Sequence, residues 1–396
     1  MNSFALRIVI YIVSVFEILS FNRIWPITNS QIHNIIHIMC GLLIALIPIF
    51  YYHKISTTNS IDKYYPHLII VPISAFFTWK MYGLLQTVPF SVKIADMLPI
   101  MKIMCERFLN GEYVYSYLDV SGGMYPIYLP MMWLPYLPAV YFHFDLRFVS
   151  LCFFLVTIFN IAPRKTNIEL LVFNVIYLSL MFAGLILFDS TLLTMSEESV
   201  VIFYYILFAL SILNHNNTMT AISITSCLLS RFSLLFYFIF CFVANFIYYD
   251  RKQSIKIFGL VLCLSASIFV YFECYKNLFT FLNLSNNYIQ AIVNNPSKYQ
   301  TLVKYGLGVA TFWEYKNLTI LHKLFMIFNF AIPFLLFAIY KKMKNIPLNI
   351  FAVLVAKMCM VVFYNFLIMP YSYLFYTSIF FSFLIINRIV FQNIQD

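Results

Sequence analysis

Apolar runs about as long as a membrane-spanning helix recur along this chain, and they restrict its fold more than any other feature. Since lipid offers the backbone no hydrogen-bond partner, each run must be helical. A helix of about 20 residues crosses a bilayer, so we expect an all-α polytopic membrane protein with about 11–13 transmembrane helices. The candidate spans are residues 5–20, 35–53, 67–88, 148–162, 168–188, 199–213, 219–230, 232–249, 257–274, 319–340, 347–368 and 371–387.

Composition supports this fold class. Of 396 residues, 62% are hydrophobic and 10% are charged, whereas soluble domains carry about 25% charged residues. The net charge is +10, but the basic residues lie in short loops instead of one stripe, which argues against nucleic acid as a partner. Such loops are typical of the cytoplasmic side. Both termini would then be cytoplasmic, and the opposite side would hold 89–147, 189–198, the Arg231 junction and 275–318.

No polar stretch is long enough to form a soluble domain, so we expect a single transmembrane domain over residues 1–396. The first apolar stretch lacks a small-residue cleavage site, which favours a retained helix over a signal peptide. The eight cysteines show no C-x-x-C pair and lie mostly in apolar runs, as buried hydrophobic residues do. We divide the chain into N-terminal helices (1–66), a central module (67–250) with an outer loop at 89–126, and C-terminal helices (251–396) with an outer loop at 275–318.

One segment, residues 93–138, differs from the apolar runs around it. Its pattern predicts an amphipathic helix over 96–110, with Asp96 at the N-cap, Pro99 in the first turn and Gly111 after the last turn. Such a helix would lie flat at the membrane interface. Lys102 and Glu106 would pair on the polar face, and the apolar face would contain Met97, Ile100, Met101, Met104, Phe108 and Leu109.

Asp96 has two interpretations. It is either a helix cap or a general base at the boundary of lipid and water, able to take a proton from an acceptor hydroxyl. The tyrosines that follow either form an interfacial belt or line a sugar-binding site. They include Tyr113, Tyr115, Tyr125 and Tyr128. The proline-rich stretch 126–142 is either a crossing or a re-entrant, broken helix.

At this point the sequence resembles a known group of proteins. The D-x-x-P run at Asp96, the amphipathic helix, "NGEYVY" and the tyrosine- and proline-rich re-entry resemble the first outer loop of GT-C membrane glycosyltransferases. "LLTMSEESVVIFYYILFAL" (192–210) and "SCLLSRFSLLFYFIF" (226–240) occupy the places of two further motifs. The resemblance is to glycosyltransferase family 87, which includes polyprenyl-phosphate-mannose-dependent mannosyltransferases. Here Glu197 and Glu198 stand where Gly-Gln is common, and Arg231 replaces a lysine.

The resemblance implies a GT-C-like fold and inverting transfer of mannose, or of another hexose or pentose. The donor would be a polyprenyl-phosphate sugar, and the acceptor a lipid-linked or envelope glycan on the non-cytoplasmic face of the inner membrane. Asp96 would be the general base. Arg231 would bind the lipid phosphate, with Arg107 as a second candidate. No protein partner is implied.

Three further acids and the aromatic residues complete the expected site. Glu197 and Glu198 either form an exposed outer turn, or bind acceptor hydroxyls or a divalent cation. Asp119 fits the geometry of a turn and is a weaker acid candidate. No cofactor is certain from the sequence. The expected substrate-binding residues are Arg231, Arg107, Tyr113, Tyr115, Asp119, Tyr125, Tyr128, Glu197 and Glu198.

Two other functions remain open from the sequence. A transporter or flippase of lipid-linked sugars usually has charged or broken helices near the midplane, and here Lys357 is nearly alone within the spans considered. An O-antigen polymerase or ligase would be expected to carry arginines and a histidine in the late outer loop, and 275–318 has neither.

Overall fold

The computed structural model describes residues 3–21, 30–55, 63–119, 125–279, 308–313, 317–343, 345–367 and 371–391. Over these residues the chain forms helices joined by short connections, and an isolated β-bridge links Tyr64 to Thr166. The predicted all-α polytopic membrane fold is confirmed. Lys298, Lys304, Lys344 and the glycines of the "SGG" turn lie outside the described residues.

Within the described residues, eight stretches are long and apolar enough to cross a membrane. Their hydrophobic side chains explain why they are helices, because only a helix satisfies its own backbone in lipid. They are α1 (Ser3–Phe21), α2 (Ser30–Ile55), α3 (His67–Thr87), α8 (Ile168–Leu187), α13 (Arg251–Tyr271), α17 (Leu318–Ile339) continuing into η6 (Tyr340–Lys342), α18 (Leu348–Phe366), and α19 (Tyr376–Ile385) with η7 (Ser372–Phe375) and η8 (Ile386–Val390).

Four other apolar helices are shorter. α7 (Arg147–Ile161) and α10 (Glu198–Leu213) are single helices, whereas α11 (Asn217–Leu228) and α12 (Leu235–Tyr248) form a pair bent by 112°. If the bent pair is counted as one span, the number of candidate membrane spans in the described residues rises to nine. The expected number of about 11–13 is reached only when α7 and α10 are also counted.

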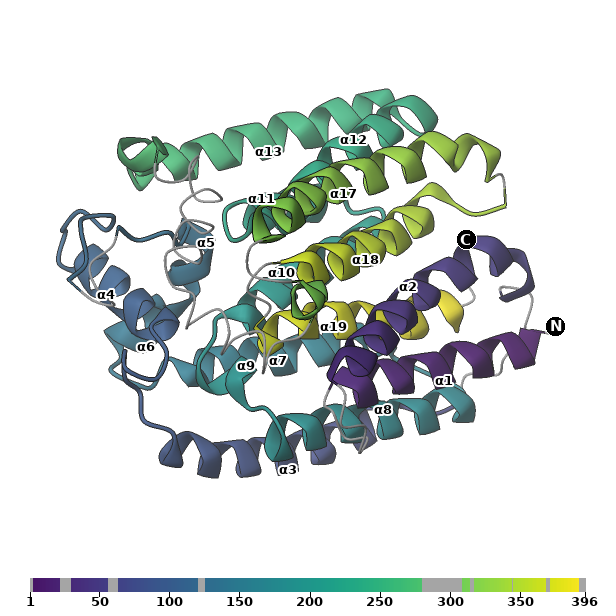
Figure 1. The fold of residues 1–396 in the computed structure, drawn as a ribbon, viewed down its shortest axis with the longest axis horizontal. Helices are drawn as coiled ribbons and strands as arrows, with labels where there is room; N and C mark the ends of the chain where they lie inside the picture. The colour runs from purple at the N-terminus through teal and green to yellow at the C-terminus, as the bar shows by residue number, and fades with distance from the viewer. Residues whose placement is uncertain are drawn as a thin grey trace.

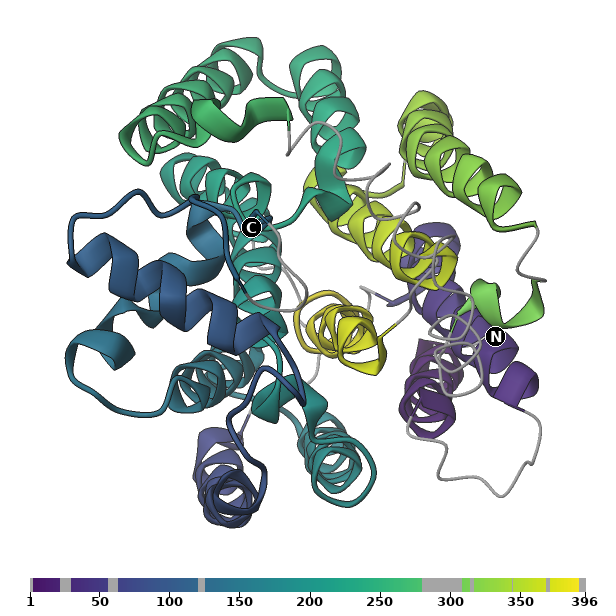
Figure 2. The ribbon, with the colours of Figure 1, turned by 60° about the vertical axis from the view of Figure 1, so that its left-hand side comes forward.

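The C-terminal helices form the centre of the bundle. The buried share is 83% for α18 and 94% for the stretch Ser372–Val390 that contains α19. Figure 2 shows the two as yellow ribbons with the other helices around them. α2 packs against α1, α18 and α19, and α10 packs against α7, α11, α18 and α19. Residues from the end of the chain are therefore positioned to contact several earlier helices.

Two of the predicted basic loops lie side by side at one end of the bundle. Tyr64 and Thr166 exchange two backbone hydrogen bonds, of 3.0 and 2.8 Å, so the loops of Lys63 and Lys165 lie together. Arg388, after α19, donates to the carbonyl oxygen of Asn160 at 2.7 Å. Arg388 also donates to the carbonyl oxygen of Ala162 at 3.1 Å, so the end of the last helical stretch lies beside the loop of Arg164 and Lys165.

The outer loop 89–147 begins and ends at the other end of the bundle. Arg147 Nη1, at the start of α7, donates to the carbonyl oxygen of Val88 at 2.7 Å. Between them lie α4 (Met97–Leu109), α5 (Pro130–Trp133), η1 (Leu134–Tyr136) and α6 (Leu137–Tyr141). In Figure 1, α4, α5 and α6 form a group at the left.

The proline-rich stretch is a broken helix. Pro130, Pro135 and Pro138 each lie at the first or second position of α5, η1 and α6, where a missing N–H costs little. With four residues in α5 and five in α6, this stretch is too short to cross a hydrocarbon core of about 30 Å. Of the two interpretations open from the sequence, the broken helix is the one observed.

α4 matches the predicted amphipathic helix closely. Ile100, Met101 and Met104 are fully buried, and α4 packs on α5, η1 and α6. Gly111 follows the helix with φ of 72°, a conformation that glycine adopts without strain. Leu109, in contrast, was expected on the apolar face and is 43% exposed.

Candidate functional site

Arg231 and the adjacent acids Glu197 and Glu198 form a buried ionic cluster. Arg231 Nη2 lies 2.6 Å from Glu197 Oε1, and Arg231 Nη1 lies 2.9 Å from Glu198 Oε2. Both glutamates are fully buried, and the arginine side chain is 20% exposed. The alternative of an exposed outer turn is therefore wrong. We call these three residues the Arg231 cluster.

The bend between α11 and α12 positions the guanidinium. Arg231 lies in this bend with an extended backbone, φ −146° and ψ 138°, directly before η2 (Phe232–Leu234). Tyr205 Oη of α10 donates to the Arg231 carbonyl oxygen at 3.0 Å and lies 2.5 Å from Ser233 Oγ. The break in the helix pair thus turns the arginine toward the start of α10, where both glutamates lie.

The two glutamates are held differently. Glu198 Oε1 accepts hydrogen bonds from Thr377 Oγ1 at 2.7 Å and from Tyr364 Oη at 3.1 Å. Glu197 Oε1 accepts a hydrogen bond from Arg231, and no described hydroxyl group donates to this carboxylate. The buried Oε2 atoms of both glutamates accept no hydrogen bond from the described residues, although Glu198 Oε2 lies 2.9 Å from Arg231 Nη1. When ionised, the cluster contains two carboxylates against one guanidinium.

Asp96 lies at the N-cap of α4, but its side chain does not cap the helix. The next residue, Met97, accepts a hydrogen bond at Sδ from Tyr373 Oη at 3.1 Å. The Tyr373 ring stacks on Tyr371 with centroids 5.5 Å apart. The pKa of Tyr371 is raised by burial and by the charge of Asp96. The start of α4 therefore adjoins η7 and the segment preceding it.

The buried phenol of Tyr128 is affected by the charges of both Asp96 and the Arg231 cluster. Burial raises the pKa of the Tyr128 phenol well above its usual value. The charges of Glu197 and Asp96 raise that pKa further, and the charge of Arg231 lowers it. Charges from both groups therefore act on one buried phenol. We define the polar site as Asp96, Tyr128, Glu197, Glu198, Arg231, Tyr371 and Tyr373.

Arg107, the second candidate for phosphate binding, holds the loop after α4. Its Nη1 donates to the carbonyl oxygens of Ser116 at 2.6 Å and Val114 at 3.3 Å, and its Nη2 donates to that of Tyr117 at 2.8 Å. A guanidinium with several donors in a fixed fork suits this task. The structure therefore gives Arg107 a positioning role in the loop.

The remaining expected site residues lie near the same loop. Tyr113 Oη is 3.4 Å from the carbonyl oxygen of Glu273 in the connection to η3 (Cys274–Asn277). Tyr115 is buried and accepts a hydrogen bond from Trp133 Nε1 at 3.3 Å. Tyr125 is half exposed, and Asp119 is exposed.

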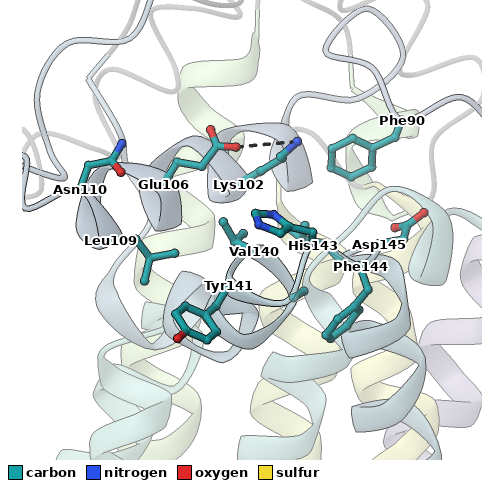
Figure 3. Close-up of a pocket in the computed structure, with 12 residues that line it drawn as sticks. Phe90, Lys102, Glu106, Leu109, Asn110, Val140, Tyr141, His143, Phe144 and Asp145 are labelled. Atoms are coloured by element: carbon teal, nitrogen blue, oxygen red, sulfur yellow. Dashed lines mark ion pairs between the residues drawn. The ribbon is translucent and has the colours of Figure 1, made fainter.

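An open groove follows the outer face of α4 (Figure 3). Its volume is about 770 Å³, and aromatic side chains such as Tyr141 and Phe144 face charged ones across it. Lys102 pairs with Glu106 at 3.8 Å on one wall, and Leu109 lies beside them. The residues that line this groove are different from those of the polar site.

Sequence reasoning missed the contribution of the C-terminal helices. Tyr364, Tyr371, Tyr373 and Thr377 all contact or surround the predicted site residues. The signal that could have identified three of them is "YSYLFYTS" (371–378), a run of hydroxyl side chains at the start of an apolar span.

Metal binding finds no direct support in the described residues. No group of three or more His, Cys, Asp or Glu side chains there is arranged to hold an ion. Glu197 and Glu198 instead bind the guanidinium of Arg231.

The fold and the polar site together define a polytopic helical membrane protein with a buried charged cluster near the start of the amphipathic helix α4. Comparisons of the chain with protein-family models, with curated proteins and with solved structures found no match.

Proposed function

We propose that this chain is a membrane-embedded glycosyltransferase that moves a sugar from a polyprenyl-phosphate donor to a glycan or glycolipid acceptor. One observation carries the proposal: Tyr373 donates to Met97, next to Asp96, and Thr377 of the same helical stretch donates to Glu198, the partner of Arg231. A lipid-linked donor needs a cation for its phosphate and a base for the acceptor, close together at the end of the hydrocarbon region.

Asp96 is the general base in this proposal. Its carboxylate takes the proton of the acceptor hydroxyl while the hydroxyl oxygen bonds to the anomeric carbon. The bond from that carbon to the phosphate oxygen breaks, and the lipid phosphate leaves with the electron pair. Attack from the face opposite the phosphate inverts the anomeric centre. That the Asp96 side chain does not cap α4 supports this role over that of a helix cap.

Arg231 binds the phosphate, and the tyrosines bind the sugar. A guanidinium can contact two phosphate oxygens at once and stays charged when partly buried. Tyr128, Tyr371 and Tyr373 supply phenol groups and ring faces near the start of α4, where Tyr373 contacts Met97 and stacks on Tyr371. We place the reaction on the non-cytoplasmic face of the inner membrane, since the polar site adjoins α4 and the basic loops of Lys63 and Lys165 lie together at the other end.

The test is Asp96→Asn, purified beside the parent and assayed for transfer from a panel of radiolabelled polyprenyl-phosphate sugars to acceptors in membrane extracts. The amide keeps the shape of the side chain and removes the base. Glu112→Gln is the matched control, because Glu112 is an exposed acid just after α4. We expect a loss of at least a hundredfold for Asp96→Asn, as removal of a general base costs ~10²–10⁴-fold, and parental activity for the control. Full activity of a folded Asp96→Asn protein would contradict the assignment.

A transporter of lipid-linked sugars is the second candidate. The observation in its favour is an ion pair buried between α1 and α18, formed by Glu17 and Lys357, because buried charges in membrane helices often mark transport pathways. Proteoliposomes distinguish the two functions. A transporter moves the labelled lipid between leaflets and leaves its sugar attached, whereas the transferase releases polyprenyl phosphate. An O-antigen polymerase or ligase would instead consume a lipid-diphosphate glycan.

A further inference from the structure

We propose that Glu197 occupies the position of the anionic ligand of Arg231 and is displaced when that ligand binds. Glu198 stays bound to Arg231 and orients the guanidinium. The inference rests on the proposed function, in which Arg231 binds a lipid phosphate. It assigns opposite roles to two adjacent acids of the same type.

Glu198 is held by contacts to three other residues. Its carboxylate binds Arg231 and also accepts hydrogen bonds from Tyr364 of α18 and Thr377 of α19. Moving this carboxylate would break contacts to two central helices as well as the ion pair. Glu198 therefore keeps the Nη1 side of the guanidinium in place.

Glu197 has no comparable support. Its side chain contacts Arg231 Nη2 at 2.6 Å, and its second oxygen is buried without a hydrogen-bond partner among the described residues. An unsatisfied oxygen of a buried carboxylate is unfavourable. Exchanging this carboxylate for a ligand oxygen therefore breaks one attachment and can relieve one unsatisfied atom.

Charge explains why displacement is needed. Where both carboxylates are ionised, their charge exceeds that of the guanidinium, and a phosphate approaching Arg231 meets the like charge of Glu197. The N-terminus of α10, which begins at Glu198, adds partial positive charge at the same place. A phosphate oxygen at Nη2 would keep this favourable field and replace the Glu197 oxygen.

The experiment measures binding of farnesyl phosphate, a short isoprenyl phosphate, to the full-length protein in detergent by calorimetry. Farnesol, which lacks the phosphate, reports binding of the lipid tail alone. We expect Glu197→Gln to bind farnesyl phosphate at least tenfold more tightly than the parent, and Glu198→Gln to bind at least tenfold more weakly. Arg231→Gln should reduce the affinity to that of farnesol.

A second pair of variants tests the role of Glu198 even if the Glu198→Gln protein does not fold. Thr377→Val and Tyr364→Phe each remove one hydrogen bond to Glu198 and leave all charges in place. Each should weaken farnesyl phosphate binding several-fold, with farnesol binding unchanged. Unchanged farnesyl phosphate affinity in both variants would overturn the supporting role of Glu198.

The remaining outcomes separate the inference from the proposed function. If Glu197→Gln weakens binding as much as Glu198→Gln does, Glu197 is also a support and the inference is wrong, even where the parent transfers sugar. Equal affinity of Arg231→Gln and parent would overturn the anion site altogether. Tighter binding by Glu197→Gln in a protein that transfers no sugar would support the inference and count against the transferase.

Discussion

Lys357 Nζ lies 2.6 Å from Glu17 Oε1 although 340 residues separate them, and this ion pair joins α18 to α1. Both side chains are fully buried. The ammonium also donates to the carbonyl oxygen and hydroxyl of Ser378, at 2.7 and 2.6 Å, and Ser382 Oγ lies 2.5 Å from Glu17 Oε2. All three ammonium donors are used, so the arrangement suits a structural role in which Lys357 holds α18 against α1 and α19.

Lys357→Met should destabilise the protein strongly. It leaves the Glu17 carboxylate buried without its cation, and breaking a buried pair in this way costs ~3–5 kcal/mol. Thermal unfolding in detergent measures the loss. The double variant Glu17→Gln with Lys357→Met removes both charges and should recover part of it. Equal stability of the single and double variants would show that the pair is not coupled.

Gly41→Ala should also destabilise, through packing. A Cβ at Gly41 would lie 2.8 Å from Val361 Cγ2 and 3.1 Å from Glu17 Oε1. Overpacking of this kind costs ~1–3 kcal/mol. Gly83→Ala in α3 is the control, because a Cβ there meets nothing within 4 Å. The control should be neutral or slightly stabilising in the same unfolding measurement, since alanine favours helix.

Tyr64→Cys combined with Thr166→Cys should form a disulfide on mild oxidation. The two residues exchange both backbone hydrogen bonds, which places their Cα atoms ~5.5 Å apart, within the range a disulfide spans. Mass spectrometry of the linked peptides gives the yield. Tyr64→Cys combined with Tyr117→Cys should not cross-link, because Tyr117 belongs to the outer loop. Equal yields would contradict the sidedness of the bundle.

The apolar runs allowed the helices to be predicted from the sequence, because lipid permits only one local solution for each run. α4 was predicted to within a residue at each end, since Asp96, Pro99 and Gly111 are local signals. The burial of Glu197 could not be predicted in this way, because its partner Arg231 is 34 residues away and is placed by a bend between helices.

The long-range partners were the least predictable part of the site. Arg231, Glu197 and Glu198 were proposed as site residues, but nothing local indicated that they pair with one another. Thr377 lies 179 residues from the carboxylate that it binds. Such contacts depend on which helices become neighbours, and the pattern within one helix does not determine that.

Arg107→Gln should lower stability and leave farnesyl phosphate binding unchanged. It removes the charged hydrogen bonds to the loop 114–117, and bonds of this kind contribute ~1.5–3 kcal/mol each. Thermal unfolding and limited proteolysis of the loop measure the effect. A large drop in affinity with no change in stability would instead assign Arg107 to the phosphate.

The Arg231 cluster and the buried pair of Glu17 and Lys357 depend on neighbouring residues of one helix. Thr377 donates to Glu198, and Ser378 donates to Glu17 and accepts from Lys357. α19 is also the last of the described spans to be synthesised, since chains emerge from the N-terminus onward. Until α19 inserts, both carboxylates lack hydroxyl partners that they have in the finished bundle. Entry of this helix therefore completes both groups in a single step of assembly.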